Sequence, residues 1–226
     1  MLGAITNGDV VVLELQREDR RNALNLELCR EIHRAVDQAV SDGARAIVIT
    51  GQGTAFCAGA DLGGVYGMEF LEALYGMLTR LTKVPVPLIA AINGPAIGAG
   101  TQLAMACDLR VAETTAKFAV PTARNGMAVD AWTIRTLATL AGGGTARRLM
   151  LAAETLDAKQ ALAVGLVDRI GTLADAVAWA QEVAELAPLA LAHNKLVLNS
   201  SAADDAAIEA SFASVWASED VREAAT

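Results

Sequence analysis

The chain has few of the residues that build metal centres or disulfide-stapled scaffolds. Its 226 residues include three cysteines and only two histidines, His33 and His193. The histidines show no metal-ligand spacing, so we expect no metal site and interpret both as ordinary surface or packing residues. The cysteines form no CxxC pair, and their odd number favours reduced thiols and therefore a cytoplasmic protein.

Positive charge is also scarce. The 18 Lys and Arg residues face 26 Asp and Glu residues, which gives a net charge of −8, and no basic cluster exceeds two residues. A nucleic-acid-binding surface needs concentrated positive charge, so nucleic acid is excluded as the main partner. The most apolar stretch, Val84 to Cys107, is interrupted by prolines and glycines and predicts no membrane span. The N-terminus lacks the pattern of a signal peptide.

Common catalytic motifs are missing too. The sequence has no P-loop, no complete dinucleotide fingerprint and no Gly-x-Ser-x-Gly nucleophile elbow. Cys57 lies in a glycine-rich segment, but no histidine is near it in the sequence to activate its thiol, so we do not interpret it as a nucleophile.

The hydrophobic pattern predicts an α/β fold. Short apolar runs typical of buried strands alternate with segments whose apolar residues recur every three or four positions, as in helices. The expected strands are Val10–Leu15, Ala46–Thr50, Val86–Ile92 and Leu109–Ala112, and the expected helices begin near Leu26 (capped by Asn25), Met68 and Ala99. From Trp132 onward the pattern predicts nearly continuous helix with no strand partners. We expect one domain, with a core over residues 1–190 and a helical region over 191–226 that belongs to it.

Two of the expected strands end in turns of small residues. The first turn carries the sequence FCAGADL (residues 56–62), and the second carries NGPAIGAG (residues 93–100). Small residues let backbone N–H groups approach a ligand, and the second turn also starts a helix, whose free N–H groups favour negative charge. Two N–H donors converging from these turns would form an oxyanion hole. On spacing alone, the alternative that the glycines only allow tight packing stays open.

These motifs resemble the two signatures of the crotonase (enoyl-CoA hydratase/isomerase) superfamily. The segment REDRRNALN (residues 17–25) resembles that family's first loop in contact with coenzyme A, and the similarity covers about residues 5 to 200. The resemblance implies a spiral of ββα units with two sheets, assembled as homotrimers or as hexamers. It also implies an acyl-CoA thioester as ligand, with coenzyme A as part of that ligand and no tightly bound cofactor. A mycobacterial hydratase-like subgroup is similar to the chain in TGQGTAFCAGADL and RIGTLADA; that resemblance implies binding of long-chain acyl-CoA rather than its turnover.

The family's functional positions can be placed residue by residue. The resemblance implies that the thioester oxygen lies between the backbone N–H groups of Ala58 and Ala99. It further implies contacts with the coenzyme A portion from the first loop and from the first turn. The residues expected to make these contacts are Arg20, Arg21, Ala23, Ala58, Gly59, Ala60, Asp61 and Leu62.

The chain departs from the hydratase pattern where acid–base chemistry is expected. Hydratases of the family carry two glutamates, and the matching positions here are Gln102 and Thr122. Neither side chain exchanges a proton usefully near neutral pH. One carboxylate remains nearby: Asp130 matches the position of an active-site aspartate in other members, and it is a candidate acid or base. The alternative is that Asp130 only caps the helix that begins beside it.

Three functions therefore stay open. The first is a non-hydrating protein that binds or shuttles acyl-CoA, the second an isomerase that uses Asp130, and the third a weak hydratase. The Ala-rich helices expected over Thr172–Leu186 and Ala190–Ala217 offer more apolar surface than one domain face should leave exposed. They independently favour a homo-oligomer.

Overall fold

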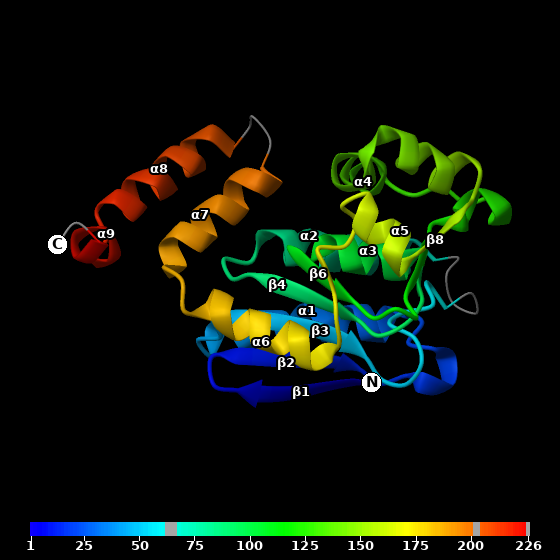
Figure 1. Cartoon of the computed structure of the whole chain (residues 1–226), viewed down its shortest axis with the longest axis horizontal. Coiled ribbons are helices and arrows are strands. Elements are labelled where there is room, and N and C mark those ends of the chain that lie inside the picture. Colours follow the sequence, from blue (N-terminus) through cyan, green and yellow to red (C-terminus); the bar gives the residue numbers. More distant parts are fainter. Residues whose placement is uncertain (62–66, 201–203, 225–226) are drawn as a thin grey trace.

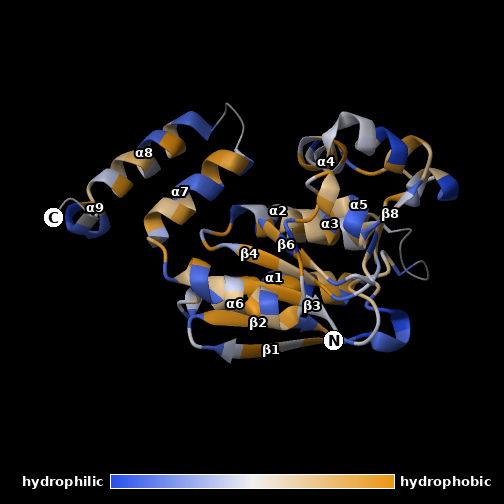
Figure 2. Cartoon of the chain, viewed as in Figure 1, coloured by the Kyte–Doolittle hydropathy of each residue, from blue (hydrophilic) through white to orange (hydrophobic). Residues whose placement is uncertain are grey.

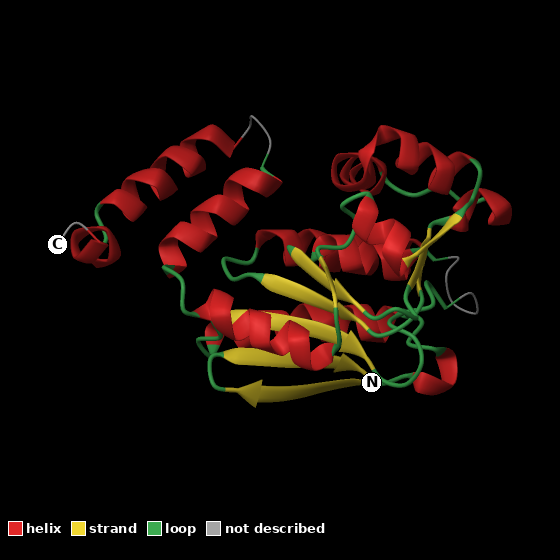
Figure 3. Ribbon diagram, in the orientation of Figure 1, coloured by secondary structure: helices red, strands yellow, loops and turns green. Residues whose placement is uncertain are grey.

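The computed structural model describes residues 1–61, 67–200 and 204–224 and contains two sheets. The larger sheet has six strands in the order β1-β2-β3-β4-β6-β9, and the smaller has three in the order β5-β7-β8 (Figures 1 and 3). The strands are β1 (Leu2–Asn7), β2 (Val10–Leu15), β3 (Ala46–Gly51), β4 (Leu88–Ile92), β5 (Ala96–Ile97), β6 (Leu109–Ala112), β7 (Lys117–Ala119), β8 (Thr155–Asp157) and β9 (Arg169–Ile170).

Helices connect the parallel strands and cover both faces of the large sheet (Figure 1). The helices of the described residues are α1 (Leu26–Ser41), α2 (Met68–Lys83), α3 (Ala99–Ala106), α4 (Ala131–Leu151), α5 (Ala158–Ala163), α6 (Leu173–Ala184), α7 (Pro188–Asn199), α8 (Asp205–Trp216) and α9 (Glu219–Ala224). Helices α1, α2 and α3 pack on one face, in the main core, and α6 packs on the other face through a smaller cluster. The predicted α/β class is confirmed.

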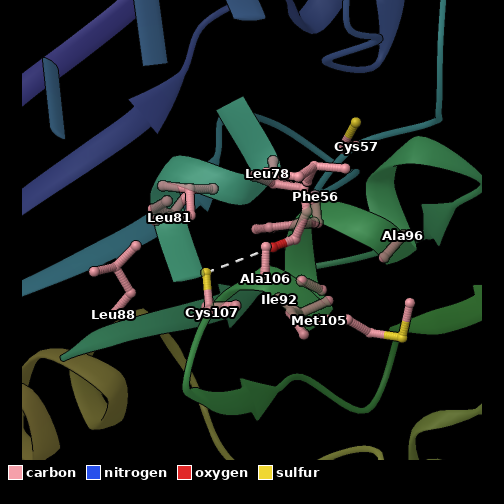
Figure 4. Packing of buried hydrophobic residues seen from close by; sticks show 14 of the residues in the cluster. Phe56, Cys57, Leu78, Leu81, Leu88, Ile92, Ala96, Met105, Ala106 and Cys107 are labelled. Atoms are coloured by element: carbon pink, nitrogen blue, oxygen red, sulfur yellow. Dashed lines mark hydrogen bonds between the residues drawn. The ribbon is translucent and has the colours of Figure 1, made fainter. Parts of the chain in front are cut away.

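The central strands are apolar because both of their faces are covered. All six residues of β3 and all five of β4 are buried, and hydrophobic residues dominate the central strands (Figure 2). Figure 4 shows the packing between α2, α3 and the strand ends, where Phe56, Leu78 and Ile92 lie in the same cluster. The first helix begins where predicted, since the Asn25 side chain accepts a hydrogen bond of 2.9 Å from the N–H of Leu28.

The prediction that the second half has no strands is wrong. Strand β8 pairs antiparallel with β7, and β9 pairs parallel with β6. These strands have only three and two residues, so neither is long enough to show an alternating pattern in the sequence. Strand β1, which pairs with β2 at the sheet edge, was not among the predicted strands either, because most of its residues are exposed.

The three C-terminal helices project away from the sheets (Figure 1). An ion pair between a buried lysine and a partly buried aspartate anchors α7: Lys195 Nζ lies 2.7 Å from Asp108 Oδ2 and donates to the Val86 carbonyl at 2.9 Å. Large apolar side chains stay exposed on α7 and α8, among them Leu198 at 83% and Trp216 at 63%. None of the helices in the described residues is both long and apolar enough to cross a membrane.

Candidate active site

The two glycine-rich turns lie side by side. The Cys57 N–H donates to the Pro95 carbonyl at 3.1 Å, and the Ile97 N–H donates back to the Cys57 carbonyl at 3.0 Å. This close approach depends on Gly100, where a Cβ would collide with the Cys57 carbonyl oxygen. The glycine therefore serves tight packing, and that packing joins the two turns.

The Ala58 N–H is not free for a ligand. It donates to the Arg21 carbonyl at 2.9 Å, so the expectation that Ala58 supplies a free donor needs correction. The donor lies two residues further on. The Leu24 N–H donates to the Gly59 carbonyl, and the Leu24 carbonyl accepts from the Asp61 N–H, each at 2.8 Å. Because successive residues of an extended segment point to opposite sides, the intervening Ala60 N–H is directed away from Leu24.

Ala60 and Ala99 are among the cavity-lining residues whose backbone N–H groups stay available to a ligand. The N–H groups of Ala60 and Ala99 have no hydrogen-bond acceptor among the described residues. Ala99 is the first residue of α3, where N–H groups lack partners within the helix. The preceding Gly98 has φ +55° and ψ −115°, a left-handed backbone that suits glycine and turns the chain into the helix.

Both donors line one cavity of about 150 Å³. Its apolar wall comes from α2 and includes Phe70, Leu71 and Leu74. Its polar side chains include Gln102 and Thr122, which the sequence analysis had singled out, so the fold brings these two together. Tyr75 and Asn125 also line the cavity, and no sequence motif had marked them. The described lining residues include no carboxylate or other charged side chain.

Asp130 caps helix α4, which was the alternative to a role as catalytic acid or base. Its Oδ1 accepts from the Thr133 N–H at 3.2 Å and from the Thr133 hydroxyl at 2.5 Å. The same hydroxyl accepts from Gln102 Nε2 at 2.7 Å, so Asp130 reaches the site through Thr133 and Gln102. Asp130 is not among the described residues that line the cavity.

The first loop is held by two residues that sequence reasoning did not single out. Arg17 Nη2 lies 2.9 Å from Asp61 Oδ2 and ties the loop to the first turn. The Asn22 side chain is fully buried, donates to the carbonyls of Gln52 and Ala55, and accepts from the Arg17 N–H. No pattern in a single sequence could have found these two residues. Arg17 pairs with a residue far along the chain, and the left-handed backbone of Asn22, at φ +57°, has no sequence signal of its own.

The residues expected to contact coenzyme A lie in different surroundings. Arg20 and Arg21 are exposed, and Arg20 lies 3.8 Å from Asp19. Ala23 is buried, and its carbonyl accepts from the Arg17 guanidinium. Leu62 lies outside the described residues.

Cys57 and the histidines have no catalytic arrangement in the described chain. Burial raises the pKa of the Cys57 thiol to about 12, so the thiol is protonated at neutral pH. A protonated thiol is a poor nucleophile, in agreement with the sequence-based interpretation of Cys57. His33 lies 3.5 Å from Asp37 on α1, and His193 lies 3.2 Å from Ser211, between α7 and α8. The described residues contain no group of three His, Cys, Asp or Glu side chains that could hold a metal ion.

The enoyl-CoA hydratase/isomerase family matches residues 5–222. The chain belongs to the enoyl-CoA hydratase/isomerase family. It is 50% identical to a probable enoyl-CoA hydratase, echA6, of Mycobacterium bovis, over 99% of this chain and 94% of that protein. It is 32% identical to a short-chain-enoyl-CoA hydratase of Clostridium acetobutylicum, over 85% of this chain and 78% of that one.

Solved structures agree with the assignment to the enoyl-CoA hydratase/isomerase family. An enoyl-CoA hydratase from Bacillus anthracis superposes with a TM-score of 0.89 and 28% identity, covering 99% of this chain and 93% of that one. The expected crotonase-like fold is confirmed. Membership in this family implies acyl-CoA thioesters as the class of ligand.

Proposed function

We propose that this enoyl-CoA hydratase/isomerase family member binds acyl-CoA thioesters and turns them over slowly or not at all. One observation carries the proposal: Ala60 and Ala99, whose backbone N–H groups have no acceptor among the described residues, line a cavity whose described lining includes no carboxylate. The N–H groups of Ala60 and Ala99 would hold the thioester oxygen. Such donors also stabilise an enolate, but proton transfer needs an acid or base within about 3 Å of the reacting atoms.

The exposed first loop supports binding of the coenzyme A portion. Arg20 and Arg21 place positive charge beside the first turn, although the whole chain has a net charge of −8. Phosphate groups pair well with guanidinium groups, and we assign the nucleotide end of coenzyme A to this loop. The apolar wall from α2 would then hold the acyl chain.

A weak hydratase is the second candidate, favoured by the names of relatives such as the echA6 protein. In this function Gln102 and Thr122 would orient a water molecule that neither can deprotonate. An isomerase that uses Asp130 has less support, because that carboxylate caps α4 and is not among the described residues that line the cavity.

One sample tests these functions together. Isothermal titration with acyl-CoA thioesters of increasing chain length measures binding, and the hydration and double-bond migration of a 2-enoyl-CoA measure turnover. We expect binding with turnover at least about 10²-fold below that of a family member with both glutamates. Hydration at rates typical of an enzyme would overturn the proposal, and so would a lack of binding by every thioester.

We further propose a cytoplasmic homotrimer or hexamer. The exposed apolar side chains on α7 and α8, which include Leu198, Phe212 and Trp216, support association through these helices. Light scattering at micromolar concentration should give three or six times the chain mass, and a strictly monomeric mass would contradict this assembly.

A further inference from the structure

Asparagine followed by glycine occurs three times in the chain, at Asn7, Asn93 and Asn125. This pair is chemically unstable, because the backbone nitrogen of a glycine, which has no Cβ to hinder it, can attack the side-chain amide of the preceding asparagine. The attack forms a cyclic imide and releases ammonia. It requires a side chain and a peptide N–H that can leave their hydrogen bonds, so the fold decides which of the three pairs reacts.

The fold holds Asn93 away from this reaction. Its Nδ2 donates to the Gly53 carbonyl at 2.9 Å, and its Oδ1 is fully buried. The next residue, Gly94, is packed so closely that a Cβ there would collide with the Thr54 carbonyl oxygen. Ring closure at this pair would break the hydrogen bond to Gly53 and would move a buried turn, and both changes cost free energy.

The fold leaves Asn125 able to react. Its side chain is exposed and has no hydrogen-bond partner among the described residues. The Gly126 N–H donates to the Ala123 carbonyl at 3.4 Å, which is long for a hydrogen bond, so little is lost when this N–H turns away. Gly126 has φ +65°, and a Cβ placed on it would meet no atom within 4 Å. The space beside the pair is therefore open.

Asn125 also lines the cavity. It is the last residue of a short 3₁₀-helix, Pro121–Asn125. Side chains three residues apart lie above one another in such a helix, so Asn125 follows Thr122 by one turn on the same face. The described lining residues include no charged side chain. A carboxylate at position 125 would therefore introduce charge where the described lining has none.

We propose that Asn125 is a self-modification site, whose deamidation places a carboxylate in the cavity and weakens the binding of acyl-CoA. The Gly126 nitrogen loses its proton and bonds to Asn125 Cγ. The Cγ–Nδ2 bond breaks, and the amide nitrogen leaves as ammonia with that proton. Water then opens the cyclic imide at either carbonyl, which gives aspartate or isoaspartate. The net change is the gain of one water and the loss of one ammonia, with no oxidation.

The effect on the ligand rests on the proposed binding of acyl-CoA thioesters. An acyl chain that enters the cavity removes water from the side chain at position 125. An ionised carboxylate loses solvation there and finds no cation among the described lining residues, which costs binding free energy. Isoaspartate also lengthens the main chain by one methylene next to Gly126, which displaces this part of the wall.

Mass spectrometry after incubation of the native chain at mildly alkaline pH tests the modification. Trypsin places the three asparagines on separate peptides, and freshly purified protein corrects for conversion during digestion. We expect Asn125 to convert at least about tenfold faster than Asn93 in the native protein. In urea the two should convert at similar rates, because the fold no longer holds Asn93. Equal rates in the native protein would overturn the proposal, and so would an Asn125 that stays intact.

Calorimetry with butanoyl-CoA tests the consequence. Affinity should fall at least about threefold once Asn125 has converted, and Asn125→Asp should show this weaker affinity without incubation. Asn125→Gln should keep its own initial affinity during incubation. Asn7→Gln is the matched control, because it removes an exposed Asn-Gly pair outside the described lining of the cavity, and it should still lose affinity.

The outcomes separate this inference from the proposed function. If fresh protein binds butanoyl-CoA and the affinity stays the same after Asn125 has converted, the effect on binding is overturned. If fresh protein binds no acyl-CoA, the proposed function fails and the effect on binding fails with it. The conversion measured by mass spectrometry does not depend on binding and decides the modification site in either case.

Discussion

Two walls of the same cavity are built in different ways. The main-chain wall consists of the N–H groups of Ala60 and Ala99, held by the paired turns. The side-chain wall consists of Gln102 and Thr122, with Thr133 and Asp130 behind Gln102. The main-chain wall depends on small residues and backbone pairing, so its donors are placed by the fold. The side-chain wall depends on which groups its residues carry, and here it carries none that transfers a proton near neutral pH.

Under the proposed function, this contrast separates acyl-CoA binding, which depends on the main-chain wall, from turnover, which depends on the side-chain wall. A thioester oxygen needs only donors, which the main-chain wall supplies. Moving a proton needs an acid or base on the opposite wall, which amide and hydroxyl groups do not provide. Changes to one wall should therefore alter one property and leave the other.

The largest expected effect comes from restoring carboxylates to the side-chain wall. Gln102→Glu combined with Thr122→Glu should raise hydration of crotonyl-CoA by about 10²-fold or more. Each single variant should gain much less, because the two groups act as a unit. The measurement is the loss of enoyl thioester absorbance, with Thr122→Gln as a control of equal size without charge. A double variant that folds, binds acyl-CoA and shows no gain would contradict the assignment of this wall.

The anchor of the C-terminal helices should affect stability without changing either wall. Lys195→Met leaves the partly buried Asp108 carboxylate without its cation and should lower the free energy of unfolding by about 2–3 kcal/mol. Urea denaturation measures this loss, and acyl-CoA affinity at low urea should stay the same. Adding Asp108→Asn to Lys195→Met should recover part of the stability, because it removes the uncompensated charge. A loss below about 1 kcal/mol would show that the pair contributes little.

The main-chain wall should respond to a bulkier side chain beside its donor. Ala99→Val should weaken acyl-CoA binding about tenfold, because the extra methyl groups crowd the approach to the Ala99 N–H. Calorimetry measures the affinity, and unfolding curves check that the fold is intact. Ala163→Val on the exposed end of α5 is the matched control and should leave affinity unchanged. Equal affinity in Ala99→Val would remove Ala99 from the wall.

The smallest effect is expected from the Cys57 side chain, which is fully buried and is not among the described residues that line the cavity. Its thiol has a pKa of about 12 because it is buried, so it stays protonated and unreactive from pH 7 to 9. Alkylation by iodoacetamide should therefore be negligible in the native protein and should proceed once urea unfolds it. Cys57→Ala should change acyl-CoA affinity by less than about twofold. Rapid alkylation of the native protein at Cys57, detected by mass spectrometry, would show that the turn opens.

Much of this molecule could be read from local patterns. Strands β2, β3, β4 and β6 and helices α1 and α2 follow from apolar runs and helical periodicity, and the Asn25 cap was recognisable as well. Strands β8 and β9 could not be recognised, because two or three residues show no period and pair only with strands far along the chain. The order of the two turn motifs was enough to indicate the family and its ligand class.

The sequence by itself determined the α/β architecture, the two glycine-rich turns and the amide and hydroxyl in place of two carboxylates. These features depend on residue type and spacing along the chain. Only the tertiary structure decided which backbone donors are free. The Ala58 N–H is taken by Arg21, a residue 37 positions away, whereas Ala60 faces the cavity. The structure likewise decided that Asp130 is hydrogen-bonded to Thr133, which in turn accepts from Gln102, because hydrogen-bond partners are set by contacts in space.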